Sequence, residues 1–552
     1  VGDGTQHSRN TGIGYQTLKA NTSGEYNTAL GNQAGLAITS GGNNVAIGAS
    51  SLDALTSGDG NVAIGKNALS TAANGENYNT AIGNNAMANS TNTSTDYSVA
   101  VGHNALSGGT GESGSNVAIG AFALDGGGTV GAAQNVAIGY EAMSGAIETA
   151  YPFWNVAIGY QSMSAGAMNA AAGNVSIGYQ SGRDITTGDY NVLLGQNAGT
   201  DITTGAYNIA LGYRALYVAT GTSNAICIGN LAGDAINNTG ADGTIAIGYS
   251  ALGALTSGGT NTAVGYNAGL TLTTGSSNTA IGYHAMRLGT VATHIVAVGK
   301  EAFENIATDT NASRNVAVGS GAGKAMTNGQ RATFIGYYAG GGFDSGNAFT
   351  NQTFVGSEAG YNHTGGGWNT IIGAEAGWGT AGFDGAENVL IGGRAGFGID
   401  DLHKAVAIGT YALQAATTTG ADGTVAIGYE ASTALTSGAN QVSIGYQAGK
   451  ALITGGYSTF IGYQAGATHT GSNNVAIGDR AFADTDADAN SLASQKNVAI
   501  GNKAMGGEIN NTVTGAVAIG YYALGTATCG TSASNGVYIG HHANKNNGGG
   551  QN

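Results

Sequence analysis

The sequence predicts an all-β protein, a parallel β-solenoid (β-roll) of about thirty coils. A short phrase, most often Asn-Val-Ala-Ile-Gly-Tyr-x-Ala, recurs thirty times, with a commonest spacing of 17 residues and extremes of 16 and 23. The residue before its glycine is always Ile, Leu or Val, and the third residue after it is always small. A short period of this kind indicates stacked repeats, each too short to hold both a strand and a packed helix.

The four residues before each motif glycine predict a short strand. Asn is the commonest first residue, Val or Thr follows, and β-branched residues favour strands. The glycine predicts a bend where a Cβ atom would be awkward; examples are Gly48, Gly65, Gly139, Gly282 and Gly428. We expect the aliphatic residue before the glycine to form a core ladder, represented by Ile47, Ile64, Ile138, Ile158, Ile281, Ile427 and Ile444.

A second aliphatic residue lies seven positions after the glycine in the 17-residue copies, for example Ile185 and Leu255. Thr-Thr-Gly or Thr-Ser-Gly follows in most of them, which indicates a strand that ends in a glycine turn. Each coil of the 17–20-residue repeat is therefore predicted to hold two short strands. Residues 1–552 are expected to form one continuous array without separate caps, whose ends are covered by another molecule.

Composition excludes several classes of protein. Glycine accounts for 100 of 552 residues, but it has no triplet period and there is one proline, which excludes collagen. Charged residues make up 9%, and the net charge of −15 is spread thinly. Nucleic-acid binding, which needs a basic stripe, is not expected. No apolar run approaches the ~18 residues of a membrane span, so membrane insertion is not expected either.

The residue two before the glycine bears on assembly. It is alanine in nineteen copies and largely apolar elsewhere, as at Cys227, which is expected to be a buried thiol. In a strand it points away from the aliphatic residue beside it, so both faces are apolar. Such a strand is typically covered on both sides, once by its own coil and once by a neighbouring chain. The alternative is that alanine merely tolerates exposure.

The phrase Asn-x-Val-Ala-Ile-Gly followed by a small residue resembles the head repeats of trimeric autotransporter adhesins of the YadA type. It is also similar to the glycine-rich repeats of some phage tail-fibre proteins. The resemblance covers all thirty copies, although the adhesin period is shorter. It implies three chains that each wind a β-roll around a common axis, and an adhesive or fibrous role outside the cell, at a cell surface or on a virion.

One segment carries oxygen ligands in alternation, which resembles the start of a calcium loop; the alternative is a solvated loop. Its residues are Asp484, Asp486, Asp488 and Asn490. No other cofactor is expected.

Three further features of the sequence are candidate sites. Asp400, Asp401 and His403 form the nearest approach to an acid/base cluster, against a solvated loop as the alternative. Tyrosine follows the motif glycine in thirteen copies, which indicates either a stabilising ring ladder or a sugar-binding strip. Trp154 and Trp368 precede motif strands and are candidates for surface recognition.

No constellation for nucleophilic catalysis can be proposed, so an enzyme is not expected. The sequence favours a structural or adhesive fibre protein that assembles with other copies of itself, as a lateral trimer, head to tail, or both. The alternative is a glycan- or receptor-binding protein, including a tailspike-like one, with its specificity in the inserted loops and host-surface glycans as partners.

Overall fold

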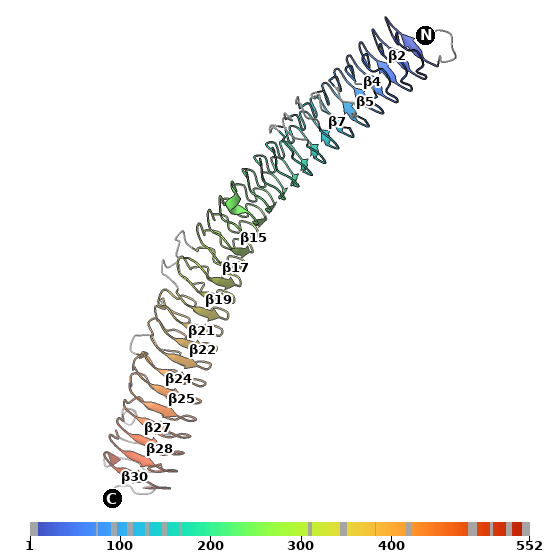
Figure 1. The fold of residues 1–552 in the computed structure, drawn as a ribbon. Coiled ribbons are helices and arrows are strands. Elements are labelled where there is room, and N and C mark those ends of the chain that lie inside the picture. Colours follow the sequence, from blue (N-terminus) through green and yellow to red (C-terminus); the bar gives the residue numbers. More distant parts are fainter. Residues whose placement is uncertain are drawn as a thin grey trace. The chain divides into compact units, whose positions relative to one another are not determined.

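The computed structural model describes residues 9–72, 75–89, 96–107, 114–126, 132–145, 152–164, 168–306, 312–342, 350–380, 382–415, 421–483, 494–507, 512–525 and 533–543. The chain groups into two compact units, Val1–Ser277 and Asn278–Asn552. Each unit is a parallel β-solenoid (Figure 1), and the one complete helical segment among the described residues is a 3-10 turn, η1 (Thr239–Ala241). The predicted all-β solenoid class is confirmed. The single array over 1–552 stays a prediction.

Every motif copy forms one three-residue strand that ends directly before its glycine. The strands of the first unit are β1 (Thr11–Ile13), β2 (Thr28–Leu30), β3 (Val45–Ile47), β4 (Val62–Ile64), β5 (Thr80–Ile82), β6 (Val99–Val101), β7 (Val117–Ile119), β8 (Val136–Ile138), β9 (Val156–Ile158), β10 (Val175–Ile177), β11 (Val192–Leu194), β12 (Ile209–Leu211), β13 (Ile226–Ile228), β14 (Ile245–Ile247) and β15 (Thr262–Val264).

The second unit contains the remaining strands. They are β16 (Thr279–Ile281), β17 (Val296–Val298), β18 (Val316–Val318), β19 (Thr333–Ile335), β20 (Thr353–Val355), β21 (Thr370–Ile372), β22 (Val389–Ile391), β23 (Val406–Ile408), β24 (Val425–Ile427), β25 (Val442–Ile444), β26 (Thr459–Ile461), β27 (Val475–Ile477), β28 (Val498–Ile500), β29 (Val517–Ile519) and β30 (Val537–Ile539).

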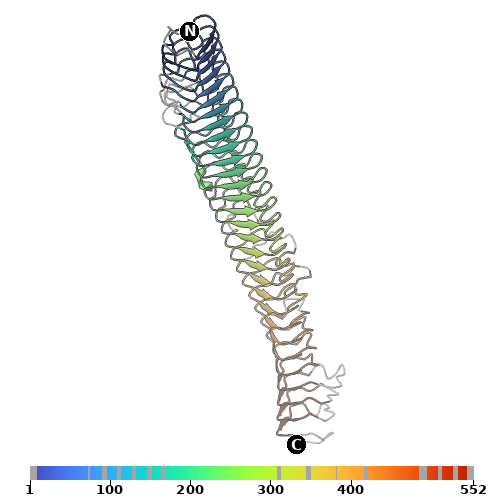
Figure 2. The same cartoon turned by 90° about the vertical axis from the view of Figure 1, so that its right-hand side faces the viewer.

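Within each unit the strands of neighbouring coils stack (Figure 2) and pair in parallel. Equivalent residues of successive repeats therefore lie side by side. Between β8 and β9, for example, Val136 lies opposite Val156 and Ile138 opposite Ile158. The Gly159 N–H continues the ladder by donating to the Ile138 carbonyl at 2.8 Å. Register is therefore set by the repeat itself.

The motif glycine is required by the distance between coils. Gly139 has φ 136°, and a Cβ atom there would lie 2.4 Å from the carbonyl oxygen of Gly159. Any side chain would collide with the backbone of the next coil. The five turn glycines singled out from the sequence all have φ between 132° and 136°; they are Gly48, Gly65, Gly139, Gly282 and Gly428.

The predicted core ladder is wrong about which strand face is inside. The alanine two before the glycine is buried, as at Ala157, whereas Ile281 is 39% exposed. The other six predicted ladder residues, Ile47, Ile64, Ile138, Ile158, Ile427 and Ile444, are only partly buried. The physical reason is alternation along the strand: the preceding asparagine faces inward, so the residue two further on faces inward too, and the aliphatic residue faces out.

A ladder of buried asparagines joins the coils from inside. The side chain of Asn155 donates to the Asn135 Oδ1 atom at 3.2 Å and to the Ala171 carbonyl at 2.8 Å. Its own Oδ1 atom accepts from the backbone and side-chain nitrogens of Asn174, at 2.9 and 3.0 Å. A buried carboxamide needs such partners, and the stacking of equivalent residues supplies them.

The predicted second strand is wrong as well. Its aliphatic residue is buried, as at Ile185, but the segment is a turn. The backbone N–H groups of Thr186, Thr187 and Gly188 all point at one acceptor, the Thr203 carbonyl, at 3.0 to 3.1 Å. Three donors on one oxygen make a bend, whereas a strand would distribute them along a ladder. Left-handed residues just before it, such as Gln180 with φ 51°, keep the chain curled.

Candidate functional surfaces

The outer strand face comprises the first and third residue of every strand. The first residue is Val, Ile or Thr and the third is Ile, Leu or Val in all thirty strands. In the described strands these residues are half-buried or exposed, while the residue between them is buried in all but β1 and β30. Each unit therefore presents an apolar face, free of charge, on its β-sheet.

Two three-coil tyrosine cassettes border the outer strand face, one in each unit. In the first, Tyr140, Tyr160 and Tyr179 stack with ring centroids 5.3 Å apart. In the second, Tyr429, Tyr446 and Tyr463 stack at 5.3 and 5.1 Å. The residue after each tyrosine builds a parallel polar ladder of Glu, Gln and Gln, with amide donor to oxygen distances of 2.7 to 2.8 Å.

The stacking geometry indicates what these rings can do. Interplanar angles of 6° to 13° mean that each ring covers the face of its neighbour. Sugars pack on ring faces, so a closed stack offers mainly edges and hydroxyl groups. The first hydroxyl of each row is engaged too: hydrogen bonds to Glu141 and Glu430 raise the pKa of Tyr140 and Tyr429, respectively. The geometry favours a stabilising ladder over a sugar-binding strip.

A groove lies on another edge of the second unit, at the residue five before the motif glycine, which we call the edge row. Its cavity measures about 480 Å³. The lining residues are Glu387, Lys404, Gly423 and Asn440 from the edge row, with His403, Asp422 and Ala439 directly before three of them.

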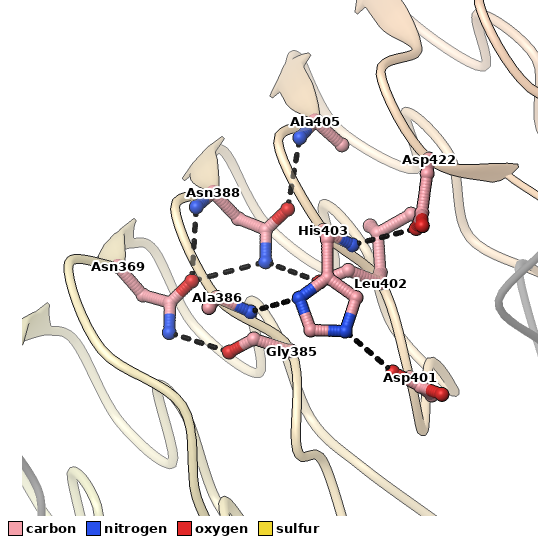
Figure 3. Close-up of polar contacts among 9 residues, drawn as sticks. All are labelled: Asn369, Gly385, Ala386, Asn388, Asp401, Leu402, His403, Ala405 and Asp422. Atoms are coloured by element: carbon pink, nitrogen blue, oxygen red, sulfur yellow. Dashed lines mark hydrogen bonds and ion pairs between the residues drawn. The ribbon is translucent and has the colours of Figure 1, made fainter.

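His403 is held in place by both ring nitrogens (Figure 3). Nδ1 lies 3.1 Å from the Ala386 backbone nitrogen, which donates to it, and Nε2 lies 2.8 Å from an Asp401 carboxylate oxygen. Because Nδ1 accepts, the neutral ring carries its proton on Nε2 and donates it to Asp401. Neither nitrogen is left to take a proton from a substrate, so the pair positions the loop.

The predicted acid/base cluster does not come together. Asp401 contacts His403, but the Asp400 carboxylate instead accepts from the backbone and hydroxyl of Thr380 in the preceding coil, at 2.9 to 3.0 Å. Consecutive carboxylates in a tight turn point to different neighbours here. What the structure supports is a hydrogen-bonded loop.

The two tryptophans differ in environment. Trp154 packs edge-on against Phe153 with ring centroids 4.8 Å apart, and its Nε1 atom donates to Gln134 at 2.5 Å. Trp368 is 68% exposed and has no ring partner among the described residues. Of the two, Trp368 is the better placed to bind something else.

The predicted calcium ligands, Asp484, Asp486, Asp488 and Asn490, lie outside the described residues. Within the part of the chain that the structure describes, no group of three His, Cys, Asp or Glu side chains is arranged to hold a metal ion. The same part contains no helix long and apolar enough to cross a membrane. Cys227 is a buried free thiol, and burial raises its pKa to about 12.

Sequence reasoning missed the groove. Its signal was a glycine in the edge row, Gly423, flanked by polar residues in the same row. Glu387 and Lys404 stand in the two preceding coils, and Asn440 stands in the next coil. That signal becomes readable only once the edge row is known to stack. A scan against models of known protein families finds no match for this chain, and a search of curated proteins finds no match either.

Proposed function

We propose that this chain is a structural, adhesive fibre subunit whose outer strand face binds the same face of other copies. The observation that carries the proposal is that this face is aliphatic or threonine at every one of its sixty positions and remains partly exposed. Monomeric proteins rarely expose apolar patches larger than a few hundred Å². By strand spacing and rise, the face covers roughly 700 Å² in each unit.

A second copy is the partner that fits this face best. A stable interface buries about 800 Å² on each partner, and the outer strand face of a single unit, at roughly 700 Å², approaches this area. Because the face lacks charged residues, two copies meet without desolvating an ion. The half-exposed tyrosine cassettes widen it at β8–β10 and β24–β26. Lateral contact of this kind suits a fibre at a cell surface or on a virion; additional head-to-tail contact stays a prediction.

Sedimentation velocity of the full chain tests the proposal. We expect the wild type to sediment as an oligomer, and a variant carrying Ile138→Lys, Ile158→Lys and Ile177→Lys to shift strongly toward the monomer. Matched lysines at exposed turn positions of the same unit, Thr187, Thr204 and Asn237, should leave the oligomer intact. Circular dichroism checks that both variants stay folded. A monomeric wild type, or equal effects of the two variants, would contradict the proposal.

The groove around Gly423 favours a second role, glycan binding.

A further inference from the structure

We propose that the groove of the second unit binds a neutral polysaccharide, which runs along the edge row from Trp368 to Asn440. The proposal does not depend on self-association, because none of the groove-lining residues belongs to the outer strand face.

The edge row is continuous through the groove. Glu387 donates its N–H to the Gly367 carbonyl, directly before Trp368, at 2.9 Å. The same backbone bond recurs from Lys404 to Ala386, from Gly423 to His403 and from Asn440 to Asp422, at 2.9 to 3.0 Å. The five residues of the row therefore lie one coil apart, at about 4.8 Å per coil, which is close to the length of one sugar ring.

Gly423 leaves a gap in the edge row because it has no side chain. Its φ is 69°, a left-handed conformation that asparagine also adopts at this row position in Asn440, with φ 60°. A Cβ atom at Gly423 would lie 2.8 Å from the Oδ1 atom of Asn440, which also lines the groove. A side chain of ordinary size would fill the gap, so the cavity exists because glycine stands here.

The walls suit hydroxyl groups and suit charged ligands poorly. Glu387 and Asp422 offer carboxylate acceptors, Lys404 offers donors and Asn440 offers both. The backbone N–H of His403 holds Asp422 in place by donating to its Oδ1 atom at 2.8 Å. Two carboxylates and one lysine line the groove, so a polyanion would be repelled by Glu387 and Asp422, and a polycation would be repelled by Lys404. A neutral polyol can pair with all of these groups.

Trp368 supplies the apolar half of a sugar site. Its indole lies three coils before Gly423, roughly 14 Å away by coil spacing, about the span of three sugars. The exposed ring can stack on the apolar face of a pyranose while hydroxyl groups of the following sugars enter the groove. An open groove lets a long chain pass through, so internal segments of a polymer can bind as well as ends.

The first unit contains a built-in control. Gly-Ala-Asp-Gly-Thr occurs both at 240–244 and at 420–424. In the first copy Gly243 has φ 71°, and Asp242 accepts from the Ser223 N–H at 2.8 Å, as Asp422 does from His403. Its neighbours in the edge row are Asn224 and Thr260, without a tryptophan, carboxylate or lysine. Backbone effects of a substitution can thus be separated from loss of the groove.

The experiment titrates the full chain with neutral hexasaccharides (cellohexaose, mannohexaose and maltohexaose) and with charged ones (hexagalacturonate and chitosan hexamer), by tryptophan fluorescence and calorimetry. At least one neutral hexasaccharide should bind the wild type. Gly423→Asn and Trp368→Ala should each weaken it by about tenfold or more. Gly243→Asn and Trp154→Ala should leave its Kd within about twofold.

Three results would overturn the inference. They are no binding of any neutral hexasaccharide at millimolar concentration, binding of charged oligosaccharides alone, or wild-type affinity in the Gly423→Asn variant. Unchanged circular dichroism of the Gly423→Asn variant excludes unfolding as the cause of lost binding.

Discussion

At the residue scale, the fold depends on the motif glycine, present in all thirty copies, and on the asparagine four before it, present in eighteen. The motif glycine allows adjacent backbones to approach, and the asparagine four before it satisfies donors and acceptors that stacking buries. Where serine replaces asparagine, as at Ser98, the hydroxyl oxygen still accepts the N–H of the next coil, from Asn116 at 3.2 Å. Alanine takes the same position at Ala225 and Ala405, and the strands still pair in register there, so the fold also tolerates coils without a side-chain acceptor in this row.

His363 makes the second unit sensitive to acid. It is buried between Phe354 and Phe383, with Nε2 3.1 Å from the Asn369 side-chain nitrogen, and burial lowers its pKa from 6.5 to about 3. Below pH 6.5 the histidine becomes protonated in the unfolded chain but stays neutral in the folded chain. The free energy of unfolding therefore decreases as the pH is lowered. The loss is about 1.4 kcal/mol per pH unit until the folded pKa is reached.

We expect amide exchange in residues 350–380 to accelerate between pH 6.5 and 4.5, after correction for the intrinsic pH dependence of exchange. His363→Leu should flatten this response by about 2 to 3 kcal/mol at pH 4.5. Segments of the first unit serve as the internal reference. An identical pH response in the wild type and the variant would show that His363 does not control this step.

At the element scale, each coil balances two inward positions against each other. Where the middle residue of the strand is large, the fourth residue after the glycine is glycine: Phe354 goes with Gly360 and Phe460 with Gly466. A Cβ atom at Gly360 would lie 2.5 Å from the Phe354 ring. Where the strand residue is alanine, as at Ala46, a buried leucine takes the facing place in several coils, as at Leu52. Other alanine coils have glycine there, and a side chain of the preceding coil lies beside it, as Leu252 does at Gly269. The interior volume is therefore balanced over adjacent coils.

This compensation predicts strong coupling between two substitutions. Phe354→Ala alone should cost about 3 to 5 kcal/mol because it leaves a cavity. Gly360→Leu alone should be destabilising because it overpacks the same space. The double variant recreates the pairing of Ala46 with Leu52, whose φ of 50° shows that leucine adopts the left-handed conformation here. It should be more stable than either single variant in denaturant titrations. Additive losses would contradict the packing account.

Some features of the coil could be predicted from the sequence and others could not. The solenoid class and the turn glycines could be predicted because their period is strict. The strand faces were assigned the wrong way round, because aliphatic size suggested a core position for residues such as Ile158. The interior of a coil is narrow, so the small Ala157 is the one inside. The second strand could not be excluded from Ile185 alone, since burial of one aliphatic residue looks the same in a turn.

The groove depends on contacts that no single repeat contains. Gly423, Lys404 and Asn440 come from three successive coils, and only their alignment in one row creates the cavity. Residues that act through stacking are visible in sequence once the repeats are aligned to the structural edge row. The asparagine and tyrosine ladders are likewise formed by side chains from successive coils.

At the scale of the whole molecule, the two units share two surface features. Each has an apolar outer strand face and a cassette of three tyrosines with a Glu-Gln-Gln ladder, while the polar groove belongs to the second unit. Under the two proposals above, lateral contact and ligand binding would use different edges of a coil. A fibre subunit of this design would then bind copies of itself and a glycan without competition between them.

The most direct test of the central claim, that the inner strand face is core and the outer face is an interface, is thiol labelling of full-length variants, read peptide by peptide by mass spectrometry. Ala157→Cys places its thiol where Cys227 already fits, and it should stay unreactive at every protein concentration. Ile158→Cys should react in dilute solution and become protected at high concentration, whereas Thr187→Cys should react in both. Rapid labelling of the Ala157→Cys variant, or labelling of the Ile158→Cys variant that does not change with concentration, would contradict the account.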